Sequence, residues 1–214
     1  MNEPHLDIRR YIMRLGIVAC EILKKEIELL TRDDPDFIER IYLEFALHLD
    51  PPVMRKRIIE TVNSLKGKVD AVLLGYAICS SLQGVAEAVD LPAVMLRGAD
   101  CFDSLMGTNE YERQKKICGM TWFELPGWAE EGVDGLIKVF HLDSAEGYDP
   151  SFFLDMMFDT FERVLYVDTG IGDRDHYVEK AQDFADKLHL RLDCSSCGLE
   201  SIQASIDELK SKFR

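Results

Sequence analysis

Short apolar runs that end at small or polar residues dominate the hydrophobic pattern of the first half of the chain. They cover residues 15–19, 41–47, 69–78 and 93–98, and apolar positions at helical spacing follow the first three. Runs of this kind are typical of parallel strands buried on both faces, and the spacing after them is typical of helices with one buried side. The pattern therefore predicts alternating strands and helices.

The second half of the chain continues this alternation. Further strands are predicted at residues 121–125, 164–167 and 190–193. Helices are predicted over residues 20–30, 53–65, 82–89, 110–116, 152–161, 177–188 and 199–212. Seven strands interleaved with helices predict an α/β fold with a mostly parallel, Rossmann-like sheet that is covered by helices on both faces.

The length of 214 residues, of which 47% are hydrophobic, is enough for a sizeable core. Residues 1–13 form a polar leader without a periodic pattern. We expect a single α/β domain over residues 14–214, with two closely packed lobes that divide near residues 129–150 as the alternative. That acidic segment contains several glycines and has the weakest pattern of the chain.

Charge and hydropathy narrow the possible partners. The formal net charge of -14 argues against nucleic acid and against an anionic membrane surface, because both select for basic patches. The longest apolar run, at residues 71–79, is too short to span a bilayer, and the first ten residues lack the apolar core of a secretion signal. We expect a soluble cytoplasmic protein.

Four potential metal ligands follow four of the predicted strands. They are Cys20, His48, Cys79 and Cys101. Because the carboxyl ends of parallel strands meet at one edge of a sheet, these side chains are expected to lie together. They could form a Cys3His zinc site, or the three thiolates could hold a [4Fe-4S] cluster with His48 facing the substrate. The alternative is that they are buried structural residues.

The remaining cysteines suggest other roles. Cys194 and Cys197 form a C-x-x-C pair that lies between a short predicted strand and a helix. The helix dipole lowers the thiol pKa of a dithiol at a helix start, which is the basis of thiol redox motifs. Half of a metal site or an exposed loop would explain the same spacing. Cys118 is expected to be structural.

Acidic and aromatic residues in the loops are further candidates. Asp100 and Asp168 each come just beyond an apolar run and are the predicted acid–base residues, with Asp100 beside a proposed ligand. Trp128 follows a Pro-Gly turn and is expected to line a pocket, with core packing as the alternative. The helix at residues 152–161 is apolar on nearly every side, which favours a homo-oligomer contact.

Short motifs between residues 15 and 190 carry a family resemblance. They are Ala19-Cys20, Leu47-His48, Leu74-Gly75-Tyr76 with Cys79, Asp100-Cys101 with Gly107 and Tyr111, Leu125-Pro126-Gly127-Trp128, and Asp168-Thr169-Gly170. With them the chain resembles DUF1638, a family of uncharacterised archaeal and bacterial proteins that look like companions of corrinoid-dependent methyl-transfer systems. Ala99 stands where the family usually has a histidine, so no histidine acts there. Cys194 and Cys197 lie outside the family pattern.

The resemblance and the residues together suggest a function. Tyr76, Trp128, Thr169 and Gly170 are the residues expected to contact a bound cofactor or ligand. We expect a metal-binding protein with a thiolate-ligated site at the carboxyl edge of the sheet, acting as an enzyme or accessory factor in anaerobic corrinoid and methyl-group metabolism. Its expected partners are a small molecule and a corrinoid protein. The alternatives are a small-molecule-binding module without catalysis and a C-x-x-C redox protein.

Overall fold

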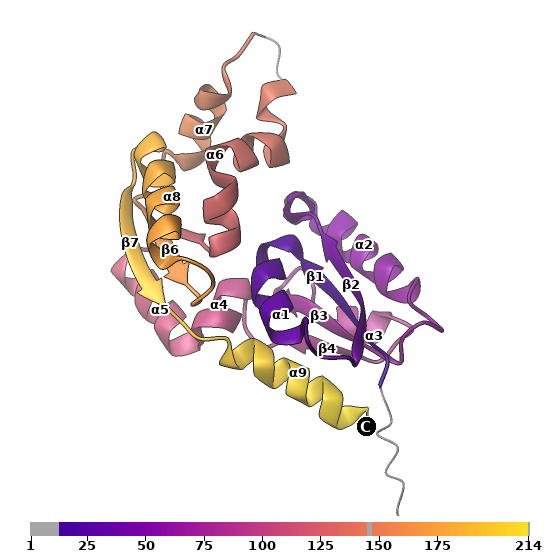
Figure 1. The fold of residues 1–214 in the computed structure, drawn as a ribbon. Helices are drawn as coiled ribbons and strands as arrows, with labels where there is room; N and C mark the ends of the chain where they lie inside the picture. The colour runs from indigo at the N-terminus through magenta and orange to yellow at the C-terminus, as the bar shows by residue number, and fades with distance from the viewer. Residues whose placement is uncertain (1–12, 145–146, 214) are drawn as a thin grey trace, which may run out of the picture.

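The computed structural model describes residues 13–144 and 147–213, so the predicted leader lies almost entirely outside the described residues. Two parallel sheets form the core (Figure 1). The first has the strand order β2 (Phe37–Leu43), β1 (Leu15–Cys20), β3 (Ala71–Ala77) and β4 (Ala93–Leu96). The second has the order β5 (Thr121–Glu124), β6 (Arg163–Asp168) and β7 (Arg191–Ser196). The predicted α/β class with parallel strands and flanking helices is confirmed.

The two central strands of the first sheet are completely buried, as their continuous apolar sequences predict. Every residue of β1 and of β3 is buried, and the two strands pair in parallel from Leu15 opposite Ala71 to Ala19 opposite Gly75. A Cβ on Gly75 would lie 2.4 Å from the Cβ of Ala19 and 2.7 Å from Cδ1 of Ile27. Glycine is therefore required at this position, because β1 and the helix that follows β1 both lie directly against it.

Helices follow the strands as the alternation predicts. The α-helices are α1 (Lys24–Thr31), α2 (Pro51–Asn63), α3 (Val85–Ala88), α4 (Cys101–Met106), α5 (Thr108–Ile117), α6 (Pro126–Phe140), α7 (Pro150–Phe158), α8 (Arg174–Lys187) and α9 (Glu200–Lys212). Three short 3₁₀ helices are η1 (Glu21–Leu23), η2 (Phe45–Leu49) and η3 (Leu142–Ser144). None of the helices formed by the described residues is both long and apolar enough to cross a membrane.

The chain divides into two lobes, each built on one sheet, and the last helix returns to the first lobe (Figure 1). α6 and α8 pack with the second sheet, whereas α9 packs on β3, β4 and α4. Ion pairs secure this return: Lys210 on α9 lies 2.9 Å from Asp36, and Glu208 lies 2.6 Å from Arg97. The carboxyl-terminal helix therefore belongs structurally to the first lobe.

The division between the sheets lies earlier in the chain than the predicted segment at residues 129–150. The first sheet ends at Leu96 and the second begins at Thr121, so the break falls in the region of α4 and α5. Most of the 129–150 segment is helical, although Gly132 has a φ of 59° and kinks α6. Residues 145–146 lie outside the described residues. The glycines and acidic residues of this segment therefore belong mostly to helices.

Two predicted strand boundaries are wrong. β2 covers Phe37–Leu43 instead of residues 41–47, and His48 lies in η2. As the edge strand of its sheet, β2 carries polar residues such as Glu39 and Arg40, so it lacks the apolar run by which buried strands are recognised. β7 extends to Ser196 and is also an edge strand with alternating polar residues.

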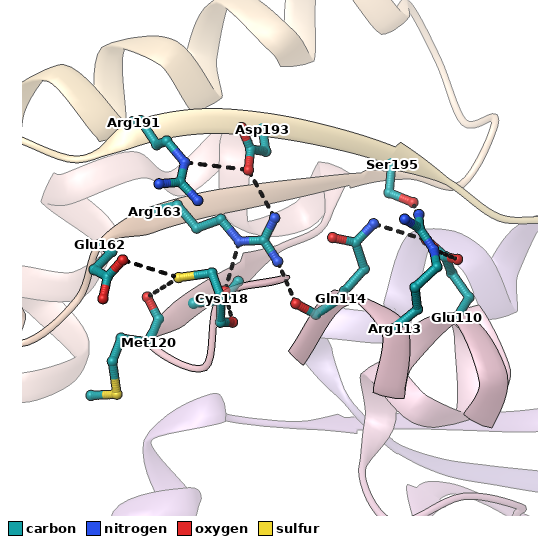
Figure 2. A network of polar contacts seen from close by, with 11 residues as sticks. Glu110, Arg113, Gln114, Cys118, Met120, Glu162, Arg163, Arg191, Asp193 and Ser195 are labelled. Atoms are coloured by element: carbon teal, nitrogen blue, oxygen red, sulfur yellow. Dashed lines mark hydrogen bonds and ion pairs between the residues drawn. The ribbon is translucent and has the colours of Figure 1, made fainter. Parts of the chain in front are cut away.

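A buried arginine connects the second sheet to α5 (Figure 2). The guanidinium group of Arg163 donates hydrogen bonds to Thr121 Oγ1, to the Gln114 carbonyl oxygen and to Asp193 Oδ2, each at 2.8 Å. These partners belong to α5, β7 and the first residue of β5. Because a buried charge is tolerated only when it is paired and hydrogen-bonded, Arg163 fixes these elements relative to one another.

We therefore predict that Arg163→Met lowers the free energy of unfolding by about 3 kcal/mol, because it leaves the Gln114 carbonyl and the Thr121 hydroxyl without their donor. Urea denaturation followed by circular dichroism measures the change. Arg113→Met is the matched control: Arg113 forms a 2.7 Å pair with Glu110 on the exposed side of α5, so its replacement should lower the free energy of unfolding far less than Arg163→Met does. Equal losses in the two variants would contradict this role.

Candidate metal and ligand site at the carboxyl ends of the strands

The carboxyl ends of the two sheets meet in the middle of the molecule. Thr169, which follows β6, donates a 2.9 Å hydrogen bond from Oγ1 to Oε1 of Glu26 in α1. Phe45, in η2 after β2, contacts the ring of Trp128 at the start of α6, with centroids 4.6 Å apart. Segments that follow β1, β2, β5 and β6 thus lie face to face, where open parallel sheets bind their ligands.

A cavity of about 240 Å³ lies at the edge of the first sheet, and we call it the inner cavity. Its walls are Ile22, Phe45, His48, Tyr76, Ala77, Cys79, Leu82, Asp100, Cys101 and Phe102. Three of the four predicted ligands, His48, Cys79 and Cys101, therefore line one cavity although they come from three different strand ends. The predicted ligand-contacting residue Tyr76 also lines it.

The fourth predicted ligand, Cys20, does not line this cavity. Cys20 is the last residue of β1 and is completely buried. Burial raises the pKa of the Cys20 thiol far above its usual range, and the neighbouring Cys101 raises it further. Burial also raises the pKa of Cys101, to about 11, and Asp100 and Cys79 add to that shift while a backbone hydrogen bond opposes it. Cys20 and Cys101 are thus close enough to influence each other, and their raised pKa values keep both thiols protonated at neutral pH.

His48 has one ring nitrogen committed and one available. Nδ1 lies 3.1 Å from the carbonyl oxygen of Phe45, which can only accept a hydrogen bond, so Nδ1 carries the proton. Burial lowers the pKa of His48, which keeps the ring neutral. Nε2 is then an unprotonated nitrogen, the form of imidazole that binds a metal or accepts a proton.

These side chains do not form a closed ligand set as they stand. Across residues 13–144 and 147–213, no three His, Cys, Asp or Glu side chains are grouped as the ligands of one metal ion. A metal would require the thiols and the imidazole to turn toward a common point. The predicted zinc or iron-sulfur site therefore stays a prediction.

Asp100 has a clear structural role at the edge of the inner cavity. Its Oδ1 accepts hydrogen bonds from the backbone nitrogens of Phe102 and Asp103, both at 2.9 Å, and so caps α4. Its Oδ2 accepts a short hydrogen bond from the hydroxyl of Tyr111. The motif that joins Asp100 to Tyr111 in the sequence thus has a structural explanation, and the predicted acid–base role of Asp100 stays a prediction.

The predicted residues at the end of β6 and directly after it lie outside the inner cavity. Asp168 is 3.2 Å from Arg174 Nε and accepts a 2.9 Å hydrogen bond from the Gly170 nitrogen. Gly170 has a φ of 75° in this turn, which favours glycine. Thr169 is buried against Glu26. Asp168, Thr169 and Gly170 line neither the inner cavity nor the larger cavity between the lobes. Their positions therefore do not explain contact with a ligand in either cavity.

A second cavity of about 450 Å³, which we call the outer cavity, lies between the lobes. It is lined by Glu21, Ile22, Lys24, Lys25, Phe45, Gly127, Trp128, Glu130, Glu131, Gly135, Lys138 and Val139. Trp128 thus lines a pocket, although it lies in the first turn of α6 rather than in a loop. Ile22 and Phe45 line both cavities, so the two spaces adjoin at these residues.

The C-x-x-C pair does not lie at a helix start. Cys194 is within the edge strand β7, and Cys197 precedes the first residue of α9, Glu200, by three positions. Burial raises the pKa of Cys194, and burial raises the pKa of Cys197 to about 12. The expected lowering of the thiol pKa is therefore wrong, because β7 is longer than predicted and no helix dipole acts on Cys194.

Two buried carboxyl groups near this junction were missed by the sequence analysis. Glu26 is completely buried and has Thr169 as its side-chain donor, and burial raises its pKa. Glu124, the last residue of β5, is completely buried, and neither of its carboxyl oxygens has a hydrogen-bond partner among the residues that the structure describes. Burial alone raises the pKa of Glu124 to about 8. Its only sequence signal is a carboxylate at the end of an apolar strand.

We predict that Glu124 makes stability depend on pH. The pKa of Glu124 is about 8 in the folded chain, whereas the ordinary pKa of a glutamate is 4.5. Between pH 4.5 and pH 8 the folded state therefore binds more protons than the unfolded state. The free energy of unfolding of the wild type consequently falls as pH rises through this range. Glu124→Gln has no carboxyl group to ionise and so removes this loss. The difference in the free energy of unfolding between the variant and the wild type should therefore be more favourable to the variant at pH 8 than at pH 4.5, by on the order of 3 kcal/mol.

Thermal unfolding at a series of pH values measures this difference. Glu131→Gln, on the exposed surface of α6, controls for the removal of one carboxylate. A difference between wild type and Glu124→Gln that is the same at pH 4.5 and at pH 8 would contradict the assignment.

Comparison with known proteins identifies a family for most of the chain. The family model described as "Protein of unknown function (DUF1638)" matches residues 42–206, which is more than half of the chain. The matched range includes three of the four predicted ligands as well as Asp100, Trp128 and Thr169. Searches of curated proteins and of solved structures find no match. The chain thus belongs to the DUF1638 family.

Proposed function

We propose that this protein binds a thiolate-ligated metal ion in the inner cavity, with Cys20, Cys79 and Cys101 as sulfur ligands and His48 Nε2 as the nitrogen ligand. The observation that carries the proposal is that three of these side chains, from three strand ends, line one cavity, while the fourth, Cys20, is buried and interacts electrostatically with Cys101. Three thiolates and one imidazole form a common ligand set for structural zinc.

The electrostatics of the cavity support a soft divalent cation. The buried thiols keep their protons when they are alone, as their raised pKa values show. A metal ion would replace these protons and offset the cost of burying thiolates together. His48 is already neutral with its Nδ1 proton donated to a carbonyl oxygen, so it would bind without losing a proton.

In this proposal the outer cavity receives the small molecule on which the metal acts. It adjoins the inner cavity at Ile22 and Phe45, and both lobes line it. Because a zinc ion held by all four side chains has no open position, it would act as a Lewis acid or activate a thiol of the ligand only when the ligand displaces one of these side chains. The corrinoid and methyl-transfer context and a corrinoid protein as partner belong to the proposal through the family resemblance. A cytoplasmic location belongs to it through the composition and hydropathy of the sequence. A homodimer belongs to it because α7 offers the exposed residues Phe152 and Met156.

Metal analysis of protein purified without oxygen tests the proposal. Wild type should contain about one equivalent of zinc, and Cys79→Ser and Cys101→Ser should lose most of it while their circular dichroism spectra stay unchanged, since serine is a poor ligand of similar volume. Cys118→Ser is the matched control, because Cys118 is buried beside Met120 and Glu162 and away from the cavity.

Other results would change the proposal in defined ways. Iron with an equal amount of sulfide, lost in the same variants, would replace zinc by an iron-sulfur cluster held by the three thiolates. Wild type without bound metal, and without uptake of added Zn²⁺, would contradict the proposal. The two cavities would then represent a small-molecule-binding module lined by unreactive thiols.

A further inference from the structure

Phe45 has an unusual number of roles for a residue in a short connecting segment. It lies in η2 between β2 and α2, and it lines both the inner and the outer cavity. Its backbone nitrogen donates a 2.7 Å hydrogen bond to Oε1 of Glu21, which follows β1. The backbone of Phe45 is therefore fixed to the end of a central buried strand.

His48 is held by Phe45 through two separate contacts. The carbonyl oxygen of Phe45 accepts the hydrogen bond from His48 Nδ1 at 3.1 Å. The ring of Phe45 stacks on the imidazole with centroids 4.8 Å apart and planes inclined by 22°. The hydrogen bond selects the ring nitrogen that keeps the proton, and the stack restricts rotation of the ring plane.

The Phe45 ring also contacts the second lobe. Trp128 packs edge-on against it, with centroids 4.6 Å apart and planes inclined by 87°. Trp128 in turn contacts Trp122 of β5, with centroids 6.0 Å apart. Because Trp128 is buried, the stacked pair of Phe45 and His48 has a fixed backing from the second lobe.

We propose that Phe45 is the positioning residue of the site: its ring and its carbonyl oxygen together hold the His48 imidazole as the Nδ1–H tautomer, with Nε2 as the nitrogen offered to the inner cavity. This inference rests on the proposed function, because a metal gives the fixed Nε2 its purpose. It adds the ring of an apolar side chain to the backbone carbonyl oxygen that, as is usual for a metal-binding histidine, accepts the hydrogen bond of the other ring nitrogen.

Nitrogen NMR of the metal-free protein tests the positioning directly. The chemical shifts of Nδ1 and Nε2, read from two-bond correlations to the ring hydrogens, report the tautomer of each histidine, and His48→Gln assigns the signal of His48. Wild type should show the Nδ1–H form. Phe45→Leu, which keeps an apolar side chain but removes the ring, should shift His48 toward a mixture containing the Nε2–H form, and Phe45→Tyr should restore the wild-type shifts.

A matched control separates positioning from packing. Ile22 also lines both cavities, so Ile22→Ala opens the same space and should leave the His48 tautomer unchanged. An unchanged tautomer in a folded Phe45→Leu variant would overturn the proposal, as would an equal shift in Ile22→Ala. If Phe45→Leu fails to fold, the same measurement on Phe45→Met replaces it.

Zinc titration then distinguishes the two proposals. Phe45→Leu should weaken the binding of added Zn²⁺ by about tenfold or more, the usual effect of losing an orienting partner of a histidine ligand. A tautomer shift in a protein that binds no zinc would overturn the proposed function and leave the positioning role supported. Tight zinc binding by wild type with no tautomer shift in Phe45→Leu would overturn the positioning role alone.

Discussion

The contact between the carboxyl ends of the two sheets is the constraint on which the rest of the structure depends. Thr169 and Glu26 join the segment after β6 to the helix after β1, and Phe45 and Trp128 join the segments after β2 and β5. Two parallel sheets placed end to end in this way direct their ligand-binding edges at each other. Both cavities and nearly all candidate functional residues lie along this junction.

The junction also explains why buried polar groups are retained there. Glu26 and Glu124 are carboxyl groups in surroundings that raise their pKa values, and Cys20 and Cys101 are thiols in the same condition. Burying such groups costs stability, so a core built only for packing would have apolar residues in their place. Of these four groups Cys101 lines the inner cavity, and a perturbed group at a cavity is typical of functional sites.

The fold and part of the site could be predicted from the sequence because they depend on local signals. The apolar runs of β1 and β3 identify buried parallel strands, and a parallel sheet brings the residues after its strands to one edge, which placed His48, Cys79 and Cys101 together. The edge strand β2 was misplaced because one of its sides is not covered by another strand. Its hydrophobic pattern is correspondingly weak.

Other features depend on contacts between distant segments and left no local signal. Nothing near Phe45 indicates that Trp128 packs on its ring from the other lobe, or that its carbonyl oxygen selects the His48 tautomer. The C-x-x-C spacing suggested a helix start, whereas pairing with β6 keeps Cys194 in a strand. Glu124 could be distinguished from the chain's other acidic residues only by its burial in the folded protein.

The central claim is that thiolates and one imidazole from separate strand ends bind a single metal ion. The X-ray absorption spectrum of the zinc-loaded protein tests it most directly, because it reports the elements around the metal and their distances. The account predicts about three sulfur atoms at roughly 2.3 Å and one nitrogen at roughly 2.0 Å from the metal. In the His48→Gln variant the signal of the histidine nitrogen should disappear from the spectrum. A shell of oxygen and nitrogen without sulfur would contradict it.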